Sequence, residues 1–179
     1  MTATNPSAHS GNSRGDDGVI TGVQVPALWF EDVAVGDDLP ELVKEPDTRQ
    51  LVMYAGASQD FVPIHYDQNI AQAAGHPTVI IHGALKSAWL AELVTGWIGP
   101  AGRLIELDVS YRGIDFPEGT MTCDGKVTET KVEHGVGLVE LEIGLRNPEG
   151  VVTTPGRALV TLPTKTVFSW GPARHLMCG

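Results

Sequence analysis

The sequence predicts an α+β domain in which one long apolar helix packs against one curved antiparallel sheet. Apolar residues recur about every four positions over residues 83–97, and from residue 103 onward they alternate with polar ones. This alternation leaves one face of the sheet polar, so the strands are expected to be antiparallel with their apolar face on the helix. At 179 residues, the chain suits a single domain with its own core.

Two short helices are expected before the long one. Asp47 or Thr48 can cap the first, whose apolar positions end near Gly56. Asp67 can cap the second, which is expected over residues 68–74. An irregular loop joins these helices.

The long helix is expected from Gly83 to Trp97, and Gly99 and Pro100 end it. Strands then follow over residues 103–111, 120–130, 139–145 and 151–162. The edge strands of such a sheet stay open, and pairing two copies edge to edge covers them, so a dimer is expected.

Three segments divide the chain. Residues 1–22 are polar, lack the apolar stretch of a signal peptide, and are expected to be a disordered leader. Residues 23–163 form the folded domain, and residues 164–179 form a C-terminal extension that would suit a docking arm.

Composition and charge restrict the classes of partner and the cellular compartment that are expected. The formal net charge is −10 without basic runs, which argues against nucleic acid or an anionic membrane as the main partner. An anionic small ligand stays open, because a few local cations can override the overall field. The two cysteines lack metal-type spacing, so a reducing cytoplasm fits. Polar residues interrupt the longest apolar stretch, so no membrane span is expected.

The loop between the short helices carries the candidate chemistry. Asp60 and His65 are five residues apart, and Pro63 stiffens the loop between them. A purely structural alternative is that Asp60 caps a turn and that the backbone satisfies His65. The context favours function, because functional groups concentrate in irregular loops and His82-Gly83 opens the apolar helix soon afterwards.

An acid, a base and a helix N-terminus suit the addition of water next to a carbonyl. A carboxylate and an imidazole that hold one water molecule can deprotonate it and protonate the α-carbon of an enoyl thioester. The free N–H of Gly83 can stabilise the charge that develops on the thioester oxygen, aided by the helix dipole. A glycine allows close approach, although tight helix–sheet packing alone would also explain it.

The segment from Tyr54 to Asp67 resembles the hydratase signature of the MaoC-like, or (R)-specific enoyl-CoA hydratase, family, which has the hot-dog fold. The matching residues are Tyr54, Ser58, Asp60, Pro63, Ile64, His65 and Asp67. The Ile81-His82-Gly83 segment is similar to the family's start of the central helix, and residues 29–37 are similar to its usual opening segment. The resemblance covers about residues 27–163.

The resemblance implies reversible, cofactor-free and metal-free hydration of a trans-2-enoyl-CoA to a 3-hydroxyacyl-CoA. In this interpretation Asp60 is the general base and acid, His65 orients and polarises the water, and the Gly83 N–H binds the thioester oxygen. The acyl group is carried by CoA or by acyl carrier protein. The candidate substrate-binding residues are Ser58, Val62, Pro63, His82 and Arg112.

Three positions depart from the family's pattern. Gln59 replaces a glycine, and Val62 replaces an asparagine that would brace the loop by hydrogen bonds. Ile114 stands where a proline is usual, within the Tyr111–Gly119 segment. The acid and the base are intact, so activity is expected to survive with a reshaped acyl entrance, while acyl length and partner choice stay open.

Two other functions stay open. A hot-dog thioesterase would need a carboxylate on the central helix, where Glu92 is the only acid and is expected on the wrong side of the site. A non-catalytic or half-active subunit would pair with an unlike hot-dog chain, as the divergent Tyr111–Gly119 segment suggests. A homodimer and a hetero-oligomer are therefore both possible.

The remaining polar candidates have simpler interpretations. Three cations can meet CoA phosphates or stay solvated at the surface: Lys86, Arg103 and Arg112. Three histidines are not expected to form a metal cluster with carboxylates: His76, His82 and His134. His82 is expected instead to order the loop, and Cys123 is expected to be buried and inert.

Overall fold

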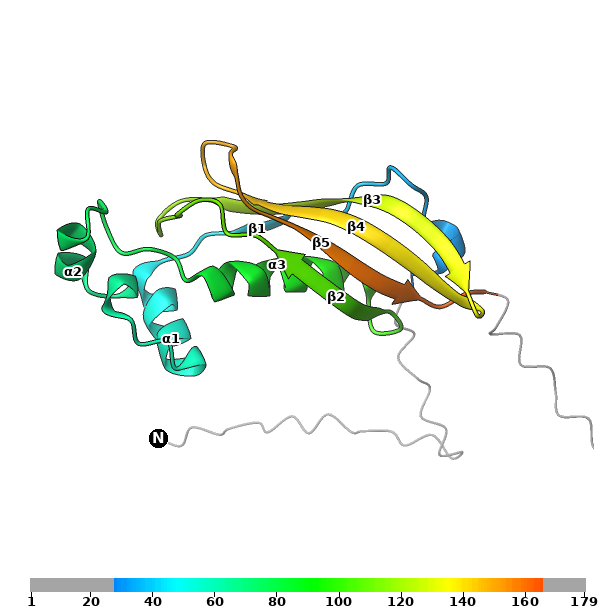
Figure 1. Cartoon of the computed structure of the whole chain (residues 1–179), viewed down its shortest axis with the longest axis horizontal. Coiled ribbons are helices and arrows are strands. Elements are labelled where there is room, and N and C mark those ends of the chain that lie inside the picture. The colour runs from blue at the N-terminus through cyan, green and yellow to red at the C-terminus, as the bar shows by residue number, and fades with distance from the viewer. Residues whose placement is uncertain (1–27, 166–179) are drawn as a thin grey trace, which may run out of the picture.

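The computed structural model describes residues 28–165. Five strands form one antiparallel sheet in the order β1-β3-β4-β5-β2. The sheet curves over α3 (Gly83–Ile98), as Figure 1 shows, which confirms the predicted α+β arrangement. The strands are β1 (Leu42–Lys44), β2 (Arg103–Val109), β3 (Met121–Glu133), β4 (Val136–Arg146) and β5 (Val152–Leu162). The predicted leader, residues 1–22, and residues 166–179 of the predicted extension lie outside the described residues.

The core lies between α3 and the concave face of the sheet. Along β4, Leu141 and Ile143 are buried while Glu140 and Glu142 are exposed, because successive strand residues point to opposite faces. On α3, buried side chains recur on the side that faces the sheet. The buried apolar residues of α3 are Leu85, Trp89, Leu90, Leu93, Val94 and Ile98.

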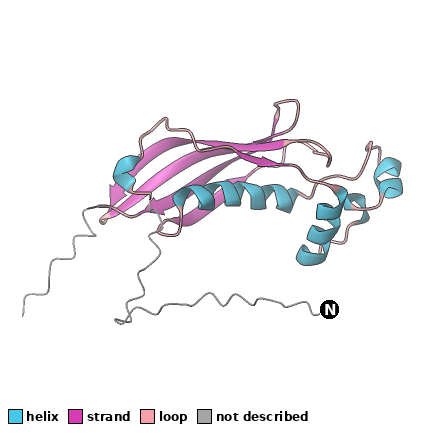
Figure 2. Cartoon of the chain, turned by 180° about the vertical axis from the view of Figure 1, so that it is seen from behind, coloured by secondary structure: helices cyan, strands magenta, loops and turns pink. Residues whose placement is uncertain are grey.

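The short helices α1 (Thr48–Ser58) and α2 (Gln68–Ala73) lie beyond the N-terminal end of α3, as Figures 1 and 2 show. Asp47 caps α1 by accepting a 2.7 Å hydrogen bond from the Gln50 N–H. The carboxylate of Asp67 accepts a hydrogen bond from the Asn69 N–H, as predicted for the cap of α2. No helix among residues 28–165 has the length and apolarity needed to cross a membrane.

Candidate active site

The loop between α1 and α2 carries both candidate catalytic side chains. Gln59 ends α1 in the left-handed conformation, with φ 61°, which turns the chain sharply. Pro63 then opens the short 3-10 helix η2 (Pro63–His65), where its fixed φ suits the first position. The Ser58 hydroxyl accepts a hydrogen bond from the Asp60 N–H and donates one to the Tyr54 carbonyl. The loop thus has a defined shape.

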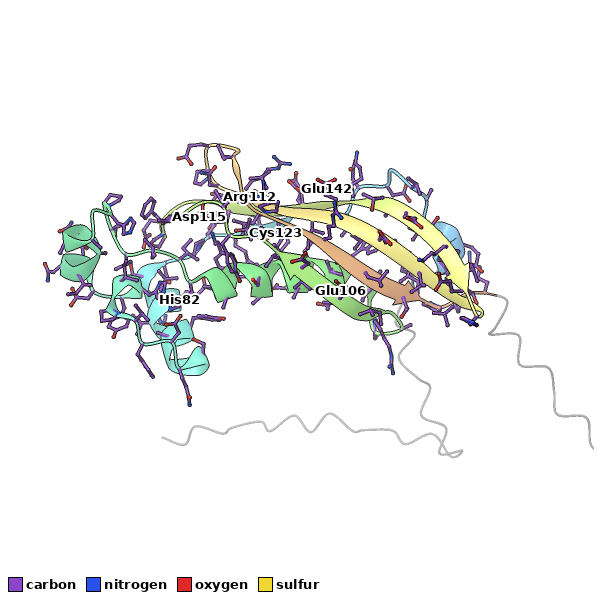
Figure 3. All side chains as sticks on the ribbon, viewed as in Figure 1. His82, Glu106, Arg112, Asp115, Cys123 and Glu142 are labelled. Atoms are coloured by element: carbon purple, nitrogen blue, oxygen red, sulfur yellow. The ribbon has the colours of Figure 1, made fainter. Side chains whose placement is uncertain are left out.

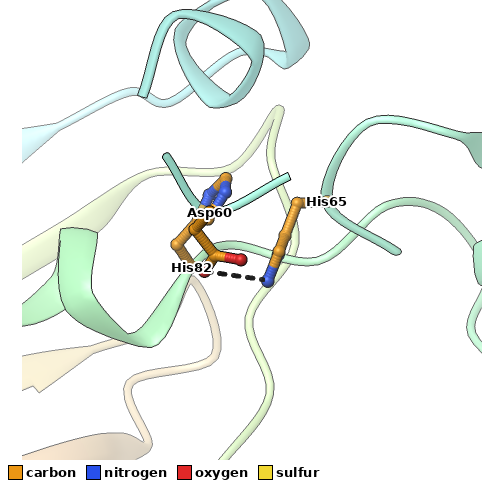
Figure 4. Close-up of side chains that lie close together, drawn as sticks. All are labelled: Asp60, His65 and His82. Carbon is orange, nitrogen blue, oxygen red and sulfur yellow. Dashed lines mark ion pairs between the residues drawn. The ribbon is translucent and has the colours of Figure 1, made fainter. Parts of the chain in front are cut away.

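Asp60 and His65 face each other across a short gap, as Figure 4 shows. Asp60 Oδ2 lies 3.9 Å from His65 Nε2, too far for a direct hydrogen bond but close enough for one water molecule to contact both. His65 Nδ1 lies 2.8 Å from the Ile80 carbonyl oxygen. A carbonyl only accepts, so Nδ1 donates, and in the neutral ring Nε2 is an acceptor directed at Asp60.

His82 forms the back of the site. Its side chain is fully buried, and its ring stacks on His65 with centroids 3.7 Å apart. The ring of Tyr54 contacts it edge-on at 5.0 Å. Neither His82 ring nitrogen has a hydrogen-bond partner within the described part of the chain. Burial lowers the pKa of His82, His65 acts in the same direction, and the nearness of Asp60 opposes both without outweighing them.

His82 lies close to His65 and to the carboxylate of Asp60, a grouping that the sequence did not reveal. His82, His65 and Asp60 each offer a potential ligand atom, all within 4.8 Å of one another. An imidazole binds a metal in the plane of its ring, however, and the two rings are stacked at an interplanar angle of 18°. With the rings nearly parallel and their centroids 3.7 Å apart, one ion cannot lie close to both rings and in both ring planes, so this arrangement does not fit a metal site.

Gly83 begins α3 directly after His82, so its N–H has no partner within the helix. A Cβ added at Gly83 would lie 3.3 Å from two ring carbons of Tyr111. The Tyr111 ring is half exposed, and its hydroxyl is hydrogen-bonded to that of Ser87, one turn along α3. The pKa of Tyr54 is raised by burial, and further by Tyr111 and Asp60, so these groups share one region. Tyr111 therefore borders the site.

The sequence singled out the Tyr111 segment only because it diverges from the family. The signal that could have found Tyr111 itself is its position just after an apolar alternating strand, where an aromatic side chain on the core face reaches α3.

The other predicted substrate-binding residues divide between two places. Ser58 ends α1 beside the catalytic candidates, Val62 and Pro63 lie in the loop with them, and Val62 is exposed. Arg112 does not join them within this chain. It lines a groove with Asp108 and Glu142 on the outer face of the sheet, and Figure 3 shows it beside Glu142 and away from His82.

The loop has a brace that the sequence did not reveal. Val62 cannot supply the hydrogen bonds of the asparagine that the family has there. The Tyr66 hydroxyl instead donates a 2.8 Å hydrogen bond to the Phe61 carbonyl, and the Val62 N–H donates to Asp60 Oδ1 at 3.4 Å. These bonds hold the turn that presents Asp60.

Lys86 is neither a solvated cation nor a candidate phosphate ligand, which corrects the prediction. Its side chain is 3% exposed, and its Nζ lies 2.8 Å from Oδ2 of Asp115, which is also buried. Glu92, the acid that a thioesterase would need, is held by Lys44 at 2.7 and 2.8 Å. Cys123 is buried, as predicted, and burial raises the pKa of its thiol to about 12.

Residues 34–145 match the family model described as MaoC like domain. The (R)-specific enoyl-CoA hydratase of Rhodospirillum rubrum is 29% identical over 108 residues, which cover 58% of this chain and 74% of that protein. The 3-oxo-4,17-pregnadiene-20-carboxyl-CoA hydratase beta subunit of Mycobacterium tuberculosis is 28% identical over 116 residues, 65% of this chain and 87% of that subunit. The fatty acid synthase beta subunit TOXC of Cochliobolus carbonum is 34% identical over 109 residues, 60% of this chain; the chain spans only 5% of TOXC's length.

Among solved structures, the (R)-hydratase from A. caviae involved in PHA biosynthesis superposes with a TM-score of 0.68 at 22% identity. The match covers 74% of this chain and 99% of that one. This likeness concerns the fold, and it confirms the hot-dog arrangement of one helix wrapped by one sheet.

Proposed function

Because the chain belongs to the MaoC-like dehydratase family, we propose that it catalyses the reversible hydration of a trans-2-enoyl thioester to a 3-hydroxyacyl thioester. The observation that carries this proposal is the 3.9 Å gap between Asp60 and His65, beside the helix that begins at Gly83. The hydratases among the relatives support the reaction class.

The geometry supports a division of roles. A water molecule in the gap donates one hydrogen bond to Asp60 Oδ2 and the other to His65 Nε2, which fixes the direction of its lone pair. As the water oxygen attacks C3 of the enoyl group, Asp60 takes its proton, and the electrons of the double bond move onto the thioester oxygen. Asp60 then returns a proton to C2. The same steps in reverse remove water.

The N-terminus of α3 is the element suited to the charge on the thioester oxygen. The N–H of Gly83 is free of helical partners and lies at the positive end of the helix dipole. Because Gly83 has no side chain, the thioester oxygen can come within hydrogen-bond distance of this amide. Removal of one such donor in other enzymes costs about 10²–10³ in kcat.

A partner chain is part of the proposal. Three large apolar side chains in the site region are exposed: Phe61, Val62 and Tyr111. Strand β2 is at the edge of the sheet, and its free side is open for pairing. A second copy or an unlike hot-dog chain would cover these surfaces. One relative is a beta subunit by name, so the hetero-oligomer stays an alternative to the homodimer.

The thioesterase alternative has less support. Glu92 comes nine residues after Gly83 on α3, and Lys44 of strand β1 neutralises its carboxylate. A carboxylate held in an ion pair nine residues along the helix is poorly placed to attack a thioester at Gly83.

The test uses short, long, branched and ring-bearing trans-2-enoyl-CoAs with the purified chain. Loss of the enoyl absorbance, with formation of the 3-hydroxyacyl product, supports hydration. Release of free CoA thiol would indicate thioesterase activity instead. Absence of turnover on every acyl class, by a chain shown to be folded and of defined oligomeric mass by light scattering, would overturn the proposal for the chain on its own.

A further inference from the structure

A buried ion pair joins α3 to the segment that follows β2. Lys86 and Asp115 are each 2% exposed, and Lys86 Nζ donates a 2.8 Å hydrogen bond to Asp115 Oδ2. Lys86 Nζ also donates to the Gly113 carbonyl at 2.9 Å. The hydroxyl of Thr153, on β5, donates to the same Asp115 oxygen at 2.7 Å. Helix, loop and sheet therefore meet at one carboxylate.

Stability alone is a poor explanation for this pair. Removing two charges from water costs several kcal/mol per ion, and well-packed apolar residues of similar volume are often at least as stable. The pair is also incompletely satisfied, because Asp115 Oδ1 is buried without a hydrogen-bond partner among residues 28–165. The role of the Lys86–Asp115 pair is therefore better explained by the groups that it holds in place.

The pair holds the backbone on both sides of Gly83. The Asp115 carbonyl accepts a 2.9 Å hydrogen bond from the Ile81 N–H, two residues before Gly83. Its carboxylate binds Lys86, three residues after Gly83. Asp115 thus holds both the segment that leads into α3 and the first turn of α3, on either side of the Gly83 amide.

The same pair holds Tyr111 over the glycine. Lys86 Nζ lies 5.8 Å from the centre of the Tyr111 ring, and it binds the carbonyl of Gly113 two residues later. The N–H of Gly113 is in turn bound to the Thr153 carbonyl at 3.0 Å. The Tyr111 ring therefore lies beside the helix, and the backbone that follows it is bound to both the helix and the sheet.

We propose that Lys86 and Asp115 are positioning residues that set the Gly83 amide and the Tyr111 ring for the reaction. Neither side chain is accessible to substrate, so both act through Gly83 and Tyr111. This inference rests on the proposed hydratase function and adds the residues that preorganise its oxyanion site. Fixed donors are effective because they need no reorganisation as charge develops.

The test compares three variants with one matched control. Lys86→Met removes the cation, Asp115→Asn keeps the shape and the acceptor oxygen, and Lys86→Met/Asp115→Leu replaces the pair by apolar side chains. Lys44→Met is the control, since it breaks the ion pair with Glu92 on the same helix, where the Glu92 side chain is 55% exposed. If Lys86→Met fails to fold, the double variant leaves no unpaired charge and keeps the test open.

Kinetics are measured at a temperature at which circular dichroism shows every variant to be folded. We expect Lys86→Met and the double variant to lower kcat about tenfold or more with KM within about threefold, since a displaced donor loses part of the 10²–10³ that a missing donor costs. Asp115→Asn keeps an acceptor oxygen for Lys86, so its kcat should fall less than that of the two Lys86 variants. The Lys44→Met control should match wild type.

A spectroscopic measurement separates positioning from a merely structural role. In an Asp60→Asn background, which prevents turnover, a bound 2,4-dienoyl-CoA shifts its absorbance to longer wavelength when its carbonyl is polarised by a hydrogen bond. The shift should shrink in the two Lys86 variants and persist with Lys44→Met. A parent shift that the Lys86 variants retain in full would overturn the positioning role alone. If the Asp60→Asn chain with Lys86 and Asp115 intact shows no shift, the oxyanion site at Gly83 and the positioning role are both wrong.

Discussion

Replacing Gly83 by alanine probes the site with one methyl group. The added Cβ would lie 3.3 Å from two carbons of the Tyr111 ring, tighter than ordinary van der Waals contact, so the ring must move by a few tenths of an ångström. Tyr111 is 55% exposed, so its ring has room for this small shift. Alanine in place of glycine gains about 0.5–1 kcal/mol in the middle of a helix, and at most that much at the first helical position, which offsets part of the displacement cost. The free energy of unfolding should therefore change by less than about 1 kcal/mol.

The effect on catalysis should be much larger. In the proposed mechanism the thioester oxygen approaches the Gly83 amide, and a methyl group on this residue would obstruct that approach. Complete loss of one such donor costs about 2.7–4 kcal/mol, or 10²–10³ in kcat, which sets the upper limit. We expect Gly83→Ala to lower kcat/KM by about ten- to a thousandfold, measured by loss of enoyl absorbance. Combining it with Tyr111→Ala should restore activity only if ring displacement, rather than the methyl group itself, causes the loss.

Gly96 provides the matched control on the same helix. A Cβ at Gly96 meets no atom of residues 28–165 within 4 Å. Gly96→Ala should therefore raise the unfolding free energy by about 0.5–1 kcal/mol and leave turnover unchanged. If Gly83→Ala retains activity within threefold of wild type, a bare amide at this position is not required, and the reasoning is wrong.

Three further predictions concern single residues. Gln59 holds φ 61°, which costs a non-glycine residue roughly 1–2 kcal/mol, while glycine loses about 0.4–1 kcal/mol more unfolded-state entropy on folding. Gln59→Gly should therefore raise the unfolding free energy in denaturant by up to about 1.5 kcal/mol, and a decrease would contradict this. The pKa of buried His82 is lowered, so the unfolded chain binds more protons than the folded one as the pH falls. The stability that the neutral ring contributes is complete above pH about 6.5 and is lost below it. The unfolding temperature of His82→Leu should therefore fall less steeply from pH 7.5 to 5.5 than that of wild type, and equal slopes would refute this. The pKa of Cys123 is raised to about 12, so its thiol should resist alkylation at pH 8 in the native chain and react once unfolded.

The sequence predicted the regular elements well because their periodicity is strong. The long helix was expected to end at Trp97 and ends at Ile98, since apolar residues repeat along its whole length. Strand β1 was not located, because three residues are too few to display an alternation. The proximity of Asp60 and His65 was accessible because both lie within one stiffened loop.

Other features of the site depend on contacts between distant segments. Lys86 looked like a surface cation because its partner, Asp115, lies 29 residues away in an irregular segment. The burial of His82 follows from packing against His65 and Tyr54, which no local pattern encodes. Such placements are decided by tertiary packing, so they become visible only in the folded chain.

The most direct test of the central claim is the rate of enoyl-CoA hydration by Asp60→Asn beside wild type. Asparagine keeps the shape of the side chain and removes the proton acceptor, so kcat should fall by about 10²–10⁴, with KM and the thermal unfolding midpoint little changed. A folded Asp60→Asn chain that hydrates the substrate at the wild-type rate would contradict the role of this carboxylate and the mechanism built on it.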